Sequence, residues 1–209
     1  VACNASGART LKYGATRNHV VGLTVVLASG ETVELRRTPL EKNTVGFQLV
    51  HDPVDWFVGS EGTLGVVVAA ELALLPLPPR ETGIGVPFTS EADALAFVVA
   101  ARAGTLAPRC LEYFDAQALG ITRTAHGDQF APPGAAALVY AEVEQEEPDL
   151  EAWLALAEEH GALGDEVRVF DSDAAIKSAR DARHAVPATM NERGARMRAS
   201  GGRKVSTDW

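Results

Sequence analysis

The segment Pro76-Leu77-Pro78-Pro79 constrains this chain more than any other feature. Three prolines in four residues remove the amide donors that a helix or an internal strand needs, so the chain must pass through here in an extended form. The hydrophobic pattern also differs on the two sides of the segment. We therefore predict two domains, residues 1–79 and 80–209.

The first part is rich in β-type residues. Two apolar or β-branched runs, Leu23 to Ala28 and Thr32 to Leu35, flank a turn-type tetrad and predict a hairpin. We expect a loop over Thr38 to Val50, followed by a short helix at Pro53 to Phe57. The run from Leu64 to Leu75 is dense in valine and leucine, which predicts a buried strand.

The second part alternates between strand and helix patterns. Its predicted strands are Ile84–Phe88, Cys110–Phe114, Ala137–Val143 and Glu166–Phe170. A two-layer α+β sandwich of ferredoxin-like type accommodates four strands with interleaved helices.

Three helices are expected between and after these strands. Ser90 is a predicted N-cap, with Leu95, Val98 and Val99 as the apolar stripe and Gly104 as the stop. A second helix begins at Pro148 and ends at Gly161. The last begins after Ser172 and is expected to end near Val186, because Pro187 follows.

Charge and composition exclude several classes of protein. The net charge of -9 argues against binding to nucleic acid or to an anionic membrane surface, and no apolar run approaches the roughly 18 residues that span a bilayer. We expect a soluble, cytoplasmic protein with reduced cysteines and no metal site, and we leave open a homodimer. Residues 174–209 carry a charge of +5, which suits either the docking of a small anion or a solvated basic surface.

Two turns in the first part contain glycine and other small residues. One is Asn4-Ala5-Ser6-Gly7, and the other is Gly59-Ser60-Glu61-Gly62-Thr63-Leu64-Gly65. Such turns let backbone N–H groups approach an anion or a flat ring without intervening side chains. Closing two strands is the alternative role of each turn.

Taken in order, the segments NASGARTLKYG, GLTVVLASGETVEL, DWFVGSEGTLGVV and PLPP resemble the second half of the FAD-binding domain in the vanillyl-alcohol oxidase superfamily. Within that superfamily the chain is similar to the D-lactate, glycolate and D-2-hydroxyglutarate dehydrogenase branch. The resemblance is strongest over about the first 80 residues. It implies the C-terminal half of a PCMH-type FAD-binding domain followed by a ferredoxin-like α+β cap.

The resemblance also implies which positions contact FAD. Backbone groups of both turns would line the flavin and its diphosphate, at Ala5, Ser6, Gly7, Gly62, Gly65 and Val67, with Ser60 and Glu61 as further candidates.

Arginines on the last predicted helix form a second candidate site. Arg180 and Arg183 border an apolar stripe that includes Ile176 and Ala179, where a guanidinium can pair with a core acid or bind a substrate carboxylate. By resemblance, Arg183 and Lys204 hold the substrate carboxylate. The glycine- and arginine-rich stretch between them, residues 191–203, predicts a mobile loop.

The implied reaction is oxidation of a 2-hydroxy acid of the D-lactate or glycolate type, with hydride transfer to FAD and an unknown electron acceptor. The family's earlier diphosphate loop and its later histidine segment are not in this sequence. We therefore expect an internal piece that has no catalytic residue and does not hold FAD tightly alone. The alternative is a non-catalytic α+β binding module that docks an anion or a protein partner.

Overall fold

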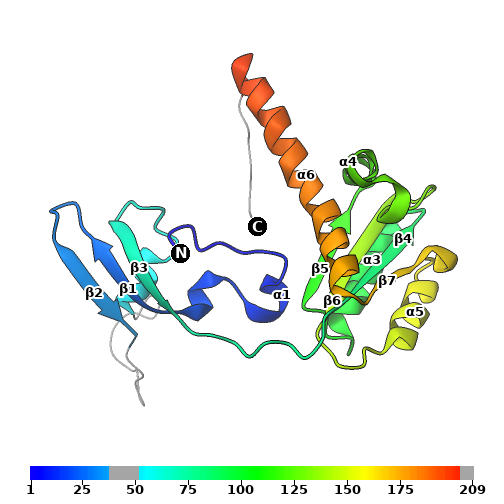
Figure 1. Cartoon of the computed structure of the whole chain (residues 1–209), viewed down its shortest axis with the longest axis horizontal. Helices are drawn as coiled ribbons and strands as arrows, with labels where there is room; N and C mark the ends of the chain where they lie inside the picture. The colour runs from blue at the N-terminus through cyan, green and yellow to red at the C-terminus, as the bar shows by residue number, and fades with distance from the viewer. Residues whose placement is uncertain (38–51, 203–209) are drawn as a thin grey trace. The chain divides into compact units, whose positions relative to one another are not determined.

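A three-stranded antiparallel sheet organises the first part of the chain in the computed structural model, which describes residues 1–37 and 52–202 (Figure 1). The chain divides into two compact units, Val1–Leu77 and Pro78–Trp209. The predicted loop Thr38 to Val50 and the candidate Lys204 lie outside the described residues.

The first unit confirms the predicted hairpin. Strands β1 (Val20–Val26) and β2 (Thr32–Arg36) pair around a turn at Gly30, and β3 (Val66–Leu72) pairs with the other edge of β1. The predicted helix is present as α2 (Pro53–Phe57), and its Val54 and Phe57 pack on β1 to form the core. Two short elements precede the sheet, α1 (Thr10–Tyr13) and the 3-10 turn η1 (Thr16–His19).

The prediction that the valine-rich run is a buried strand was wrong in its burial. Strand β3 forms, but Val66 and Val68 are 62% and 58% exposed. Among the described residues β3 is an edge strand that pairs with β1 alone, and the helix α2 packs against β1 and β2. Only Val67 reaches the small core from this strand.

The second unit has the predicted ferredoxin-like order of strands. Strands β4 (Thr82–Phe88), β5 (Cys110–Phe114), β6 (Ala137–Val143) and β7 (Arg168–Phe170) form one antiparallel sheet in the order β5-β6-β4-β7. Crossover helices α3 (Glu91–Ala103) and α5 (Leu150–Glu159) make β4-α3-β5 and β6-α5-β7 units. The helix α4 (Ala116–His126), which the sequence analysis did not anticipate, lies in the connection from β5 to β6.

Two short 3-10 turns complete the unit, η2 (Gly127–Gln129) and η3 (Gly164–Glu166). The second turn replaces the first residues of the strand predicted at Glu166, and α5 begins one residue after its N-cap Asp149, not at Pro148.

Helix α3 is capped as predicted, but the face of the helix that packs on the sheet differs from the predicted one. The Ser90 hydroxyl accepts from the Asp93 amide, and Gly104 ends the helix. The buried residues are Ala94, Phe97 and Ala101, and Val98 is partly buried against the same core. Leu95 and Val99 are exposed, so the predicted stripe was wrong at these two positions and right at Val98. Alanines on the inner face let the helix approach the sheet closely, while the bulk of Phe97 fills the core beside Phe88.

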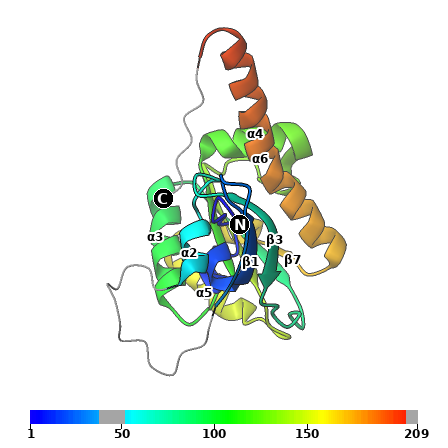
Figure 2. The same cartoon turned by 90° about the vertical axis from the view of Figure 1, so that its left-hand side faces the viewer.

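The prediction that the last helix ends before Pro187 was also wrong. Helix α6 (Asp173–Ala199) continues through Pro187 for a further three turns and replaces the mobile loop predicted from residue 191 (Figure 1). A proline removes one amide donor, and the arginine, methionine, glutamate and alanine residues that follow favour helix. Figure 2 shows α4 lying beside α6, with which it is in contact. None of the described helices combines the length and the apolar composition needed to cross a membrane.

Candidate functional site

The two turns singled out in the sequence lie side by side in the first unit. The amide of Glu61 donates to the carbonyl oxygen of Ala2 at 2.9 Å, and the side chain of Asn4 accepts from the amide of Arg17 at 2.9 Å. Asn4 and Glu61 have positive φ angles of 45° and 52°. The backbone bends sharply at both points, and the contact joins Ala2 and Glu61, which are 59 residues apart in sequence.

Four of the six predicted flavin contacts are exposed on these turns: Ala5, Ser6, Gly7 and Gly62. A Cβ atom added to Gly7 or Gly62 would meet no atom within 4 Å, so the space beside both glycines is open. The amide of Gly7 itself donates to Oγ1 of Thr10 at 2.9 Å. Within residues 1–37 and 52–202, no group accepts a hydrogen bond from the amide of Ser6 or Gly62. These amides can serve a ligand, the property that a phosphate or a flavin ring requires.

The other two predicted flavin contacts, Gly65 and Val67, are residues that the packing of the first unit also explains. A Cβ atom on Gly65 would lie 2.7 Å from Cγ1 of Val25 and 2.9 Å from the carbonyl oxygen of Val26, so packing against β1 requires glycine here. Val67 is paired with Val25 in the sheet and packs on the core. Only the backbone of these two residues could contribute to a ligand site.

A partly buried cluster of ion pairs, which the sequence analysis missed, holds the second turn in place. Arg17 donates to Asp55 Oδ1 at 2.9 Å and to the carbonyl oxygen of Val58, and Arg37 donates to both carboxylate oxygens of Asp55 at 2.6 and 2.8 Å. The hydrogen bonds from Arg37 hold the pKa of Asp55 below its usual value, against the effect of burial. The cluster ties α2, and the glycine loop after it, to the start of β1.

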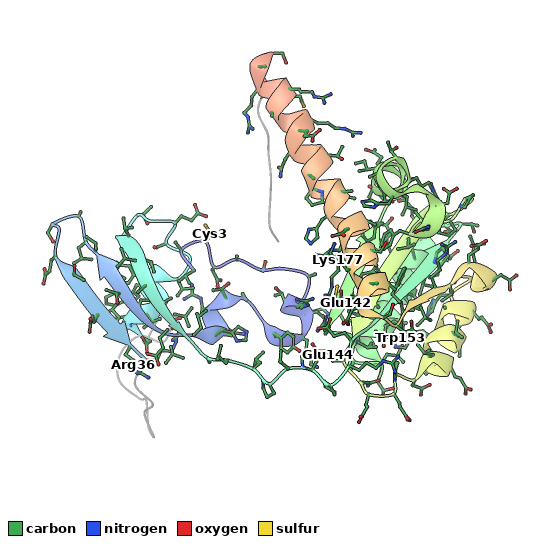
Figure 3. The ribbon with its side chains drawn as sticks, viewed as in Figure 1. Cys3, Arg36, Glu142, Glu144, Trp153 and Lys177 are labelled. Atoms are coloured by element: carbon green, nitrogen blue, oxygen red, sulfur yellow. The ribbon has the colours of Figure 1, made fainter. Side chains whose placement is uncertain are left out.

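In the second unit, Arg180 pairs with acidic side chains. This is the first of the two roles that the sequence analysis left open for a guanidinium on this helix. Its Nε donates to Glu142 at 2.8 Å and its Nη2 donates to Glu81 at 2.7 Å. Figure 3 labels Glu142 in the second unit. Arg109, which is 2% exposed, donates to the same two glutamates and to Glu144. We call these five residues the inner ion network.

The inner ion network is held in its charged form. Burial alone would raise the pKa of Glu142, but hydrogen bonds from Arg180 and Arg109 outweigh it and bring the pKa to about 2. The same carboxylates raise the pKa of both arginines. Arg180 is therefore committed to the structure of the unit and has little capacity left for a substrate.

Arg183 lies one turn further along α6 and is held more loosely. Its Nη1 is 3.1 Å from Oε2 of Glu112 on β5, and its Nη2 is 3.3 Å from the ring nitrogen Nε2 of His184. Burial raises the pKa of Glu112 in spite of the nearby guanidinium.

A cavity of about 390 Å³ opens next to this guanidinium, which we call the Arg183 pocket. It is lined by Glu112, Tyr113, Phe114, Ala118, Arg183, His184, Val186 and Pro187. The lining combines the Arg183 guanidinium, and the Glu112 carboxylate that pairs with it, with apolar and aromatic side chains. A guanidinium in such surroundings suits a small carboxylate that can compete with Glu112. The structure does not describe Lys204, so the predicted pairing of Arg183 with Lys204 stays a prediction. No group of three or more metal-ligating side chains occurs among the residues described.

Comparison with known proteins defines the class to which this fold belongs. Residues 77–206 match the family described as FAD linked oxidases, C-terminal domain. The chain therefore belongs to the FAD-linked oxidase family, and the second unit carries its C-terminal domain.

Three curated relatives show which members of the family the chain resembles. The chain is 36% identical over 132 residues to D-lactate dehydrogenase of Anaerostipes hadrus, covering 63% of this chain and 27% of that protein. It is 41% identical over 129 residues to D-2-hydroxyglutarate dehydrogenase of Xanthomonas citri pv. viticola, covering 62% and 26%. It is 38% identical over 112 residues to glycolate oxidase subunit GlcD of Bacillus subtilis, covering 54% and 23%. The chain thus spans about a quarter of the length of these relatives.

A solved structure supports the fold over most of the chain. Alkyldihydroxyacetonephosphate synthase matches with a TM-score of 0.62 at 19% identity, covering 87% of this chain and 37% of that one. At this level of identity the likeness concerns the fold alone.

Proposed function

We propose that this chain is part of an FAD-dependent oxidoreductase that oxidises a 2-hydroxy acid of the D-lactate or glycolate type. The family match and the names of the relatives support the class of reaction. The observation that carries the substrate class is the Arg183 pocket, which presents one loosely held guanidinium beside an apolar wall.

We assign FAD binding in the first unit to backbone groups of the two turns. Among the described residues the amides of Ser6 and Gly62 have no acceptor, so they fit a diphosphate or a ring edge, and Gly7 leaves open space beside Ser6. Ala5 is fixed beside Ser6 because its carbonyl oxygen accepts from Thr16. Gly65 and Val67 would contribute backbone atoms only. Bound FAD would supply the hydride acceptor, which no protein side chain can provide.

We assign the substrate carboxylate to Arg183, with Lys204 as a second cation. A guanidinium forms two parallel hydrogen bonds with a carboxylate and so fixes both its position and its orientation. Fixing the carboxylate of a 2-hydroxy acid also fixes its C2 carbon, the atom that loses hydride. Arg180 is left out of this role because two carboxylates already occupy it.

We also place the protein in the cytoplasm. The chain has only two cysteines, Cys3 and Cys110, which lie far apart in sequence, and this usage is typical of a reducing compartment.

The test uses the complete enzyme that contains this chain, with D-lactate and glycolate as electron donors and an artificial dye as acceptor. Arg183→Gln should lower kcat/KM by about 10- to 100-fold, because one charge-assisted hydrogen-bonding group is lost. Arg196→Gln is the matched control, since Arg196 lies on the same helix and its side chain is 84% exposed. Equal activity of the two variants would contradict the assignment of Arg183.

A further inference from the structure

Arg183 already meets a carboxylate of its own chain at the place where we position the substrate. Glu112 is the third residue of β5 and lies opposite Tyr140 of β6 in the sheet. Its Oε2 atom is 3.1 Å from Nη1 of Arg183, and both side chains line the Arg183 pocket. An incoming carboxylate therefore encounters Glu112 as well as the arginine.

Glu112 is the least firmly held of the glutamates on this side of the sheet. Arg180 makes three hydrogen bonds to two carboxylates, and Arg109 makes four to three carboxylates. The contact between Arg183 and Glu112 measures 3.1 Å, whereas the ion pairs of the inner ion network measure 2.5 to 2.8 Å at their closest atoms. A longer contact at the edge of a cavity is the easiest of these to exchange.

The surroundings of Glu112 do not favour its charge. Burial raises its pKa, and the ionised Glu142 of β6 adds repulsion, while Arg183 and His184 of α6 oppose the rise. Tyr140 of β6, its partner in the sheet, is itself buried and has a raised pKa. Displacing the Glu112 carboxylate from Arg183 therefore gives up a weakly stabilised contact.

We propose that Glu112 is a placeholder for the substrate carboxylate: it neutralises Arg183 in the empty site and gives up the guanidinium when a hydroxy acid binds. The inference rests on the proposed function, because it takes Arg183 as the substrate contact. Two like-charged carboxylates compete for one cation, so Glu112 weakens binding below what Arg183 alone would give. Glu112 thus lowers the affinity of the site for the hydroxy acid and lets the bound acid exchange readily.

The experiment measures the Kd of glycolate for the complete FAD-loaded enzyme that contains this chain, from the saturation of the rate of flavin reduction in the absence of oxygen. Glu112→Gln keeps the shape of the side chain and removes its charge, and should tighten glycolate binding by about tenfold. Glu158→Gln is the matched control, because it removes the same charge from an exposed position on α5 and should leave the Kd unchanged. Glu112→Met, a neutral side chain that needs no hydrogen-bond partner, is the second variant if the amide impairs folding.

Arg183→Gln separates this inference from the function on which it rests. Tighter binding in a neutral Glu112 variant, together with loss of binding in Arg183→Gln, supports the placeholder. Unchanged or weaker binding in the Glu112 variants, with binding still lost in Arg183→Gln, overturns the placeholder and leaves Arg183 as the substrate contact. Glycolate binding that survives Arg183→Gln, or that is undetectable in both the wild type and the Glu112 variants, overturns both proposals.

Discussion

Arg180 Nε lies 2.8 Å from Oε1 of Glu142, a carboxylate that is almost fully buried on β6. This contact commits one of two neighbouring arginines on α6 to the interior and leaves Arg183, one turn later, beside a cavity. Sequence spacing places both arginines at the edge of the same helical stripe. Their partners distinguish a structural arginine from a candidate substrate-binding one.

Glu142→Gln should destabilise the second unit by about 3 kcal/mol, because Arg109 and Arg180 would lose their shared buried anion. Urea unfolding followed by circular dichroism measures the change. The exposed Glu158→Gln should shift the free energy of unfolding by less than about 0.5 kcal/mol. Equal stability of the two variants would show that the inner ion network is not a net support of the fold.

The same glutamate predicts how stability depends on acidity. The pKa of Glu142 is lowered from 4.5 to about 2, so its contribution to stability is complete above the unfolded value of 4.5 and is lost as the pH falls towards 2. The wild-type chain should lose more stability over this interval than Glu142→Gln does. Parallel curves for the two proteins in acid unfolding experiments would refute the lowered pKa.

Asp55→Asn should loosen the glycine loop after α2. The variant removes the anion shared by Arg17 and Arg37, at an expected cost of about 1–3 kcal/mol. Hydrogen exchange at the amide of Glu61, which donates to Ala2, should become faster than in the wild type. Exposed Glu34→Gln on β2 provides a control, and an unchanged exchange rate in Asp55→Asn would mean that the loop is held by other contacts.

Two glycines should respond in opposite ways to alanine. Gly65→Ala places a methyl group against Val25 and should cost about 1–3 kcal/mol of stability, whereas Gly7→Ala meets open space and should cost little. In the complete enzyme, Gly7→Ala should instead reduce FAD retention, measured as flavin absorbance per protein after gel filtration. Full retention of FAD would remove Gly7 from the proposed flavin contacts.

Much of the second unit could be predicted from local pattern. Strands β5 and β6 begin and end where apolar periodicity places them, and Ser90 and Ser172 cap their helices as expected. These features depend on neighbouring residues, which a sequence displays directly. The end of α6 was missed because Pro187 is a local stop signal that the long helix overrides.

The candidate site was harder to predict because its contacts join distant segments. Glu142 and Arg180 are 38 residues apart, and Glu81 and Arg180 are 99 apart, so no spacing rule identifies them as partners. Gly65 is a predicted flavin contact, and the close approach of Val25 gives its lack of a side chain a second explanation. Only the folded geometry separates a glycine required by packing from one that leaves a peptide open.

The most direct test of this account is a glycolate titration of the complete enzyme that contains this chain, observed at the Nε–Hε resonances of its arginines. We predict a saturable shift of the Arg183 resonance, with the Arg180 resonance unmoved because its carboxylate partners remain in place. A shift of Arg180 without Arg183, or no saturable shift at Arg183, would contradict the assignment of the substrate carboxylate.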